Sequence, residues 1–94
     1  MTTYNFCFLG FGNVGRALVR LLVAKSNELR DGYGIEWKIT GVATRRLGWL
    51  SAENGVDAGQ LLAGNLDQLS THTGITDWLH SAQPAVVFET TSLN

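Results

Sequence analysis

The chain has 94 residues, enough for one compact domain, and its 45% apolar and 16% charged residues are typical of a globular protein rather than a disordered one. A net charge of -1 offers no basic surface of the kind that nucleic-acid binding requires. The lone cysteine excludes an internal disulfide, so we expect a cytoplasmic protein. No apolar run reaches the roughly 18 residues of a membrane span. We therefore expect neither nucleic-acid nor membrane partners.

Three short apolar segments are predicted to be buried strands. Residues 4–9 read YNFCFL and stop at Gly10, which places Cys7 inside a strand. Residues 35–43 alternate at first and then become apolar, and residues 85–90 read AVVFET. Their length and their β-branched and aromatic content favour strands over helices.

Helical patterns lie between these segments. Residues 13–30 repeat apolar side chains at the spacing of one helix face, and glycines follow the pattern. Weaker helical signals cover residues 47–53 and 58–62, and a clearer one covers residues 76–82. Helices therefore connect each predicted strand to the next.

This order of elements predicts the α/β class, with a parallel sheet and helical crossovers. We expect a partial Rossmann fold, a three-stranded parallel sheet of order 2-1-3 flanked by helices. Because a complete dinucleotide-binding domain needs more chain, residues 1–94 would be its N-terminal half, and a catalytic or substrate domain would be absent from the chain. The order 2-1-3 creates a topological switch point, where such sheets bind ligands, at the carboxyl end of the first strand.

A glycine-rich turn follows that strand and matches the pattern G-x-G-x-x-G. Gly10 permits a tight turn, Gly12 lets a diphosphate approach the backbone, and Gly15 lets the helix pack closely on the strand. Backbone N–H groups at the positive end of the helix dipole would point at the phosphates. The predicted diphosphate site consists of Gly10, Phe11, Gly12, Asn13, Val14 and Gly15. The alternative is a turn that only connects a strand to a helix.

The end of the second predicted strand bears on the choice between NADP and NAD. In NAD sites an acidic residue at this place holds the ribose hydroxyls. Here Thr44, Arg45 and Arg46 occupy it, and no carboxylate lies between Glu36 and Glu53. Guanidinium groups bind a 2'-phosphate through paired hydrogen bonds, and a threonine hydroxyl adds a donor. We therefore expect NADP to be preferred over NAD; the alternative is a pair of solvated loop arginines.

Hydroxyl side chains follow the third predicted strand. Thr90, Thr91 and Ser92 come after Glu89, at the same predicted edge of the sheet as the glycine turn. They would lie near the nicotinamide end of the cofactor. The alternative is that they form a turn, as hydroxyl residues at strand ends often do.

Three blocks of this sequence resemble the N-terminal part of the homoserine dehydrogenases: FLGFGNVGRALVRLL, ITGVATRRLG and VVFETTSLN. The resemblance implies interconversion of L-homoserine and L-aspartate 4-semialdehyde with NADP or NAD, in threonine and methionine biosynthesis. It implies that the backbone from Phe11 to Val14 binds the diphosphate and that Arg45 or Arg46 lies at the adenosine phosphate. Thr90, Thr91 and Ser92 would lie on the nicotinamide side, and the full-length protein would be a homo-oligomer.

No catalytic or metal-binding residue is expected in this chain. The family's catalytic lysine and acidic substrate-binding residues belong to a second domain, whereas Lys25 and Lys38 fall in a predicted helix and a predicted strand. His72 and His80 lack the partner set of a metal site. The chain alone should therefore be inactive. A nucleotide-binding regulatory or redox-sensing module without chemistry is the alternative function, and a semialdehyde dehydrogenase is another enzyme with such a domain.

Overall fold

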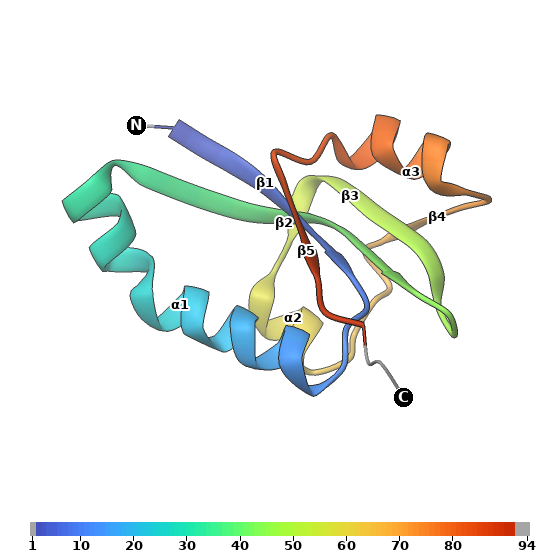
Figure 1. Ribbon diagram of the computed structural model, residues 1–94, viewed down its shortest axis with the longest axis horizontal. Helices are drawn as coiled ribbons and strands as arrows, with labels where there is room; N and C mark the ends of the chain where they lie inside the picture. The colour runs from blue at the N-terminus through green and yellow to red at the C-terminus, as the bar shows by residue number, and fades with distance from the viewer. Residues whose placement is uncertain (1, 92–94) are drawn as a thin grey trace.

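Strands and helices follow one another along residues 2–91, the part of the chain that the computed structural model describes (Figure 1). The elements are β1 (Thr2–Leu9), α1 (Asn13–Tyr33), β2 (Ile35–Thr44), β3 (Gly48–Val56), α2 (Ala58–Leu62), β4 (Ser70–His72), α3 (Ile75–Ala82) and β5 (Val86–Glu89). The predicted α/β class is confirmed, since helices connect strands that belong to one sheet.

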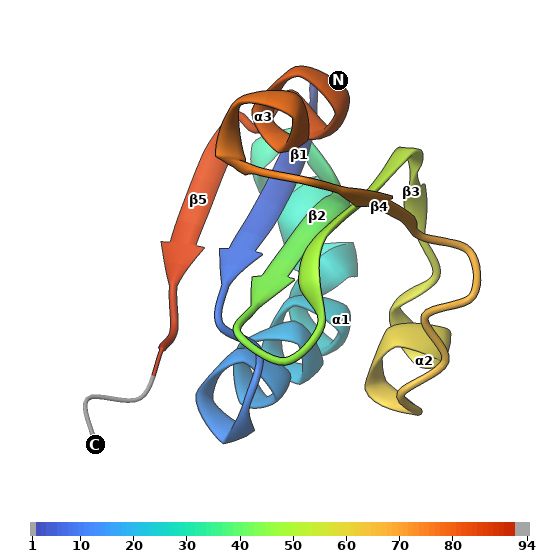
Figure 2. The same ribbon diagram turned by 90° about the vertical axis from the view of Figure 1, so that its right-hand side faces the viewer.

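The sheet of the described residues has five strands in the order β4-β3-β2-β1-β5 (Figure 2). β1 pairs in parallel with both β2 and β5, whereas β3 pairs antiparallel with both β2 and β4. The prediction of a three-stranded, wholly parallel sheet is therefore wrong in strand number and in direction. The three parallel strands stand in the order β2-β1-β5 inside the larger sheet.

A hairpin after β2 accounts for the difference. Residues 47–53, predicted weakly as helix, fall largely within β3, which returns along β2. The Leu47 N–H donates to Thr44 Oγ1 at 2.9 Å, and Gly48 has φ +81°, a conformation that favours glycine. The chain therefore reverses immediately after β2 instead of entering a helix.

α1 connects β1 to β2 and is the longest helix described. It ends at Gly34 in the left-handed conformation (φ 66°), and the Gly34 N–H donates to Arg30 O at 3.1 Å. This glycine cap lets the helix run to Tyr33, past the predicted end at residue 30. Within residues 2–91, no helix is long and apolar enough to cross a membrane.

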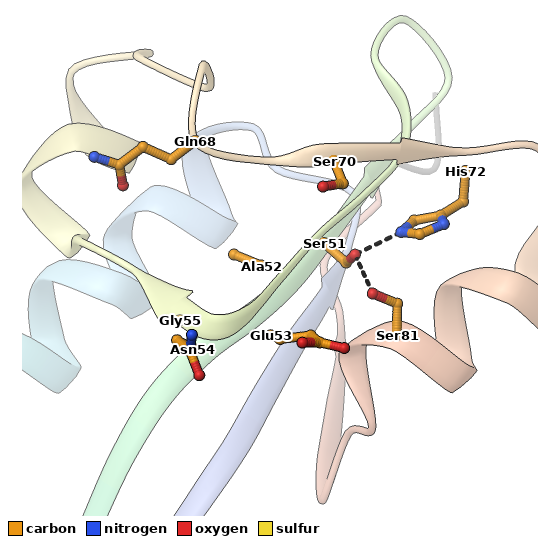
Figure 3. A pocket seen from close by; sticks show the side chains of 9 residues that line it. All are labelled: Ser51, Ala52, Glu53, Asn54, Gly55, Gln68, Ser70, His72 and Ser81. Atoms are coloured by element: carbon orange, nitrogen blue, oxygen red, sulfur yellow. Dashed lines mark hydrogen bonds between the residues drawn. The ribbon is translucent and has the colours of Figure 1, made fainter.

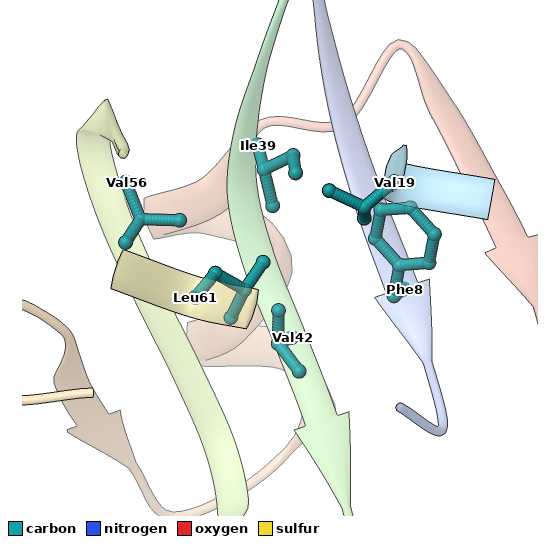
Figure 4. Close-up of a cluster of buried hydrophobic side chains, with 6 residues drawn as sticks. All are labelled: Phe8, Val19, Ile39, Val42, Val56 and Leu61. Atoms are coloured by element: carbon teal, nitrogen blue, oxygen red, sulfur yellow. The ribbon is translucent and has the colours of Figure 1, made fainter. Parts of the chain in front are cut away.

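α1 and α2 cover one face of the sheet and enclose its larger core (Figure 4). Side chains from β1, β2 and β3 meet those of the two helices there, and Phe8 also stacks on Phe88 of β5 at 5.2 Å between ring centroids. The buried members are Phe8, Val19, Ile39, Val42, Val56 and Leu61. This core holds the start of α1 against the carboxyl end of β1.

α3 covers the opposite face with a smaller core. Trp78 and Ala82 pack against Cys7 and Ala43, and the Trp78 indole N–H donates to Leu50 O at 2.7 Å. Burial raises the pKa of the Cys7 thiol, and a hydrogen bond with Thr40 offsets part of that rise. Cys7 is thus a protonated core residue rather than a reactive thiol.

We predict that the core is stabilised by Leu61 far more than by a leucine on the helix surface. Leu61 is 0% exposed and Leu21 is 54% exposed. Leu61→Ala should lower the free energy of unfolding by about 2–5 kcal/mol, because it leaves a cavity between α2 and the sheet. Urea denaturation measures this, with Leu21→Ala as the matched control. Equal losses in the two variants would contradict the packing described here.

Candidate functional site

The carboxyl ends of β1, β2 and β5 meet at one edge of the sheet (Figure 1). The Gly10 N–H donates to Ala43 O near the end of β2 (2.7 Å), and the Thr90 N–H after β5 donates to Leu9 O (2.8 Å). The three segments predicted to form the site are therefore neighbours: the glycine turn, the hairpin loop after β2 and the threonines after β5. Ser92 lies outside the described residues.

Gly10 cannot be replaced without strain in this turn. Its φ is +82°, and a Cβ there would lie 2.8 Å from the Thr91 Cα. The Thr90 hydroxyl donates to Gly10 O at 2.6 Å, which holds the turn against the end of β5. At Gly15 a Cβ would lie 3.0 Å from the Phe11 ring and 3.1 Å from Thr90 Oγ1. Both glycines thus allow the turn and the start of α1 to pack closely against the residues after β5.

Gly12 differs from these two glycines, because a Cβ on it would meet no atom within 4 Å. It is the N-cap of α1 and has no side-chain cap, and Asn13 and Val14 are exposed beside it. The first N–H groups of a helix have no partner within the helix, and they carry its positive end. Among the hydrogen bonds of residues 2–91, none has the Asn13 or Val14 N–H as its donor, so the turn presents amides on an open surface, an arrangement that suits an anionic group.

Phe11 is the one bulky residue inside the turn, and it is held from several sides. Its ring packs edge-on against Phe8, with centroids 5.6 Å apart. The Arg16 guanidinium carbon lies 5.3 Å from the Phe11 ring centroid, and Arg16 Nη1 donates to Leu62 O at 2.9 Å. Sequence reasoning missed Arg16. A cation in the first turn of a helix, where it opposes the helix dipole, was the available signal.

The hairpin loop after β2 carries both predicted arginines at its tip. Arg45 and Arg46 are exposed, and neither forms an ion pair within residues 2–91. The Thr44 hydroxyl oxygen accepts from the Leu47 N–H, so it shapes the loop as well as lying at its base. The loop therefore offers two unpaired positive charges beside the glycine turn.

The threonines after β5 are engaged with the protein itself. The Thr90 hydroxyl donates to the glycine turn, and the Thr91 N–H donates to the Glu89 carboxylate at 2.8 Å. The Thr91 hydroxyl donates to the same carboxylate. These two hydrogen bonds favour the ionised carboxylate and lower the pKa of Glu89. Both threonines thus shape the strand end, and Thr90 joins it to the turn.

A cavity lies away from the glycine turn, between β3, β4 and α3 (Figure 3). It has a volume of about 380 Å³ and a polar lining. Ser51 Oγ lies 2.6 Å from His72 Nε2 and 2.7 Å from Ser81 Oγ. This resembles a nucleophile beside a base, but Ser51 is only 1% exposed and its hydroxyl is shared between two partners. The contacts join two strands to a helix. Among residues 2–91, no group of three His, Cys, Asp or Glu side chains could hold a metal ion.

Comparison with known proteins relates the chain to one enzyme family. No family model matches the sequence. The NAD(+)-dependent homoserine dehydrogenase of Pseudomonas canavaninivorans is 36% identical over 61 residues, which are 65% of this chain and 17% of that protein. The chain therefore spans a small part of the length of this relative. The resemblance predicted from the three sequence blocks is confirmed.

Solved structures of a hyperthermophilic archaeal homoserine dehydrogenase in complex with NADPH share the fold. One has a TM-score of 0.73 at 20% identity and covers 97% of this chain and 29% of its own. A mutant of that enzyme, also with NADPH, has a TM-score of 0.74 at 20% identity, with 98% and 30% covered. Both likenesses extend over nearly the whole chain.

We predict that two glycines of the turn differ in their effect on folding. Gly10→Ala should lower the free energy of unfolding by about 1–3 kcal/mol or more, because alanine is strained at positive φ and its Cβ meets Thr91 backbone atoms. Gly12→Ala should cost clearly less, because its Cβ points into open space and only the weaker N-cap preference of alanine acts against it. Thermal denaturation of both variants measures the difference, and similar melting temperatures would contradict this geometry.

Proposed function

We propose that this chain, a relative of the homoserine dehydrogenases, is the N-terminal half of a dinucleotide-binding domain and binds NADP, or NAD more weakly. The observation that carries the proposal is the open, amide-lined turn at Gly12, at the carboxyl end of the central parallel strand. The NADPH-bound enzymes of the same fold support it. In the whole protein the cofactor would exchange a hydride during interconversion of L-homoserine and L-aspartate 4-semialdehyde.

The diphosphate would lie over Gly12. Its charge would be met by the free N–H groups of Asn13 and Val14 and by the positive end of α1. The absence of a side chain at Gly12 leaves room for the phosphates against the backbone. Gly10 and Gly15 would contribute indirectly, since they permit the turn and its packing rather than touching the ligand.

The hairpin loop would choose between the two cofactors. Arg45 and Arg46 are exposed and form no ion pair with the other residues of the 2–91 segment, so they are available to a 2'-phosphate. Thr44, at the base of the loop, can still donate its hydroxyl proton while its oxygen accepts from Leu47. An NAD site would instead place a carboxylate here, which would repel that phosphate.

The residues after β5 would face the nicotinamide half of the cofactor. Thr90 ties this strand end to the glycine turn, so a ligand on the turn would also be close to Thr90 and Thr91. Ser92, the next residue in the sequence, completes the proposed nicotinamide-side set. Thr90 and Thr91 already donate their hydroxyl protons to the protein. Their contact with the cofactor would therefore use hydroxyl oxygens as acceptors.

We assign no catalytic residue within this chain. Lys25 pairs with Glu28 on α1 (3.4 Å), and Lys38 on β2 donates to the Glu53 carbonyl (3.5 Å), so neither lysine lies at the glycine turn. Hydride transfer would need a substrate domain outside these 94 residues. We place the whole protein in the cytoplasm, as a homo-oligomeric enzyme of threonine and methionine biosynthesis.

We predict that the chain binds NADP more tightly than NAD, by about tenfold or more, the value of one charged hydrogen bond. Replacing Arg45 and Arg46 together by alanine should remove this preference and leave the affinity for NAD nearly unchanged. Calorimetric titration with both cofactors measures it, with Arg20→Ala, an exposed arginine on α1, as the control. Equal affinities for the two cofactors in the unaltered chain would refute the role of the arginines.

We also predict that Gly12→Val abolishes binding of both cofactors without unfolding the protein. The valine side chain would fill the open space over the turn, where we place the diphosphate, yet it meets no protein atom. The matched control is Gly32→Val, a second position where a Cβ has open space, far along α1. Titration and melting curves of both variants give the test. Binding at full strength in Gly12→Val would show that the turn only connects β1 to α1.

A further inference from the structure

We propose that Arg16 is the positioning residue of the glycine turn: its guanidinium clamps Phe11 to the end of α2, which holds the amides of Gly12, Asn13 and Val14 in place for a diphosphate. The inference rests on the proposed function for the identity of the ligand. It adds a residue outside the glycine pattern and gives α2 a role in binding.

Arg16 joins two elements that lie side by side, the first turn of α1 and the end of α2 (Figure 2). Its Nη1 donates to the Leu62 carbonyl at 2.9 Å, in the last turn of α2. Carbonyls at a helix end have no partner within the helix and carry its negative end, so a guanidinium is a favourable partner. α2 has five residues and needs such external contacts to stay in place.

The same guanidinium covers one face of the Phe11 ring, which other residues contact from other sides. Phe8 packs on the ring edge-on, Gly15 lies so close that a Cβ would be 3.0 Å from it, and Arg16 lies over its face at 5.3 Å. Phe11 directly precedes Gly12, whose neighbours offer their N–H groups to the ligand. Removing the guanidinium frees one face of the ring and thereby loosens the backbone next to Gly12.

The position of Arg16 argues against a role in the helix alone. A positive charge in the first turn opposes the dipole of α1, and the structure compensates it with the Leu62 carbonyl and the Phe11 ring. Arg20 carries the same charge one turn later and is exposed. Arg20 is therefore a suitable control for Arg16, because it has the same charge but lies outside the turn.

The experiment compares Arg16→Gln, Arg16→Lys and Arg20→Gln in their binding of NADP and of 2'-AMP. 2'-AMP has the phosphate expected at Arg45 and Arg46 but no diphosphate, so its affinity should not depend on the glycine turn. Arg16→Gln should weaken the binding of NADP by up to roughly tenfold, the value of the charged hydrogen bond to Leu62 O that orders the turn, and leave the binding of 2'-AMP unchanged. Arg16→Lys should recover part of the loss, because an ammonium can still donate to Leu62 O and lie over the ring. Arg20→Gln should bind both as the unaltered chain does.

An unchanged affinity of Arg16→Gln for NADP, or an equal loss for NADP and 2'-AMP, would overturn the inference. Amide hydrogen exchange provides a readout without any ligand. Arg16→Gln should speed exchange at Gly10 and Ala17 relative to Arg20→Gln, and equal rates would overturn the clamp. An unaltered chain that binds neither ligand would overturn the proposed function, while faster exchange in Arg16→Gln would still support the clamp on the turn.

Discussion

The backbone of Gly10 is bonded to the strands on both sides of its own. Its N–H donates to Ala43 O of β2, and its carbonyl accepts from the hydroxyl of Thr90 after β5. These two bonds hold the positive φ at which the chain leaves β1 and turns into α1. The same bonds position the hairpin loop after β2 and the threonines after β5 relative to the turn. The geometry of the whole candidate site therefore depends on this one residue and its neighbours.

The surroundings of the three glycines of the G-x-G-x-x-G pattern distinguish those with a structural role from the one available for binding. Gly10 and Gly15 lie against protein atoms, whereas the space over Gly12 is open. A turn that served only as a connection would have no need of a glycine with free space at a helix N-cap, where serine, asparagine or aspartate would cap the helix better. The opening at Gly12 supports binding at this point. The polar cavity near Ser51 is explained by contacts that join β3, β4 and α3.

The cores on the two faces of the sheet fix β1, the strand that leads into the glycine turn. Phe8 and Val19 join β1 to α1 on one face, and Cys7 and Trp78 join β1 to α3 on the other. β1 is thus packed on both faces and paired on both edges before it reaches Gly10. Binding sites are held accurately when they are built on such elements rather than on long loops. The side chains that would contact a ligand, in contrast, lie on short exposed segments at the sheet edge.

The sequence by itself determined the α/β class, the three parallel strands, the helix after the glycine turn and the resemblance to homoserine dehydrogenases, because these depend on local periodicity and on a motif of contiguous residues. Only the tertiary structure decided the two antiparallel strands, since the short apolar run at Trp49 and Leu50 is compatible with helix or strand until it pairs with β2. It also decided the role of Thr90 and the contacts of Arg16, which join residues far apart along the chain. Contacts of this kind leave no periodic signal in the sequence, because they are set by the packing of whole elements against one another.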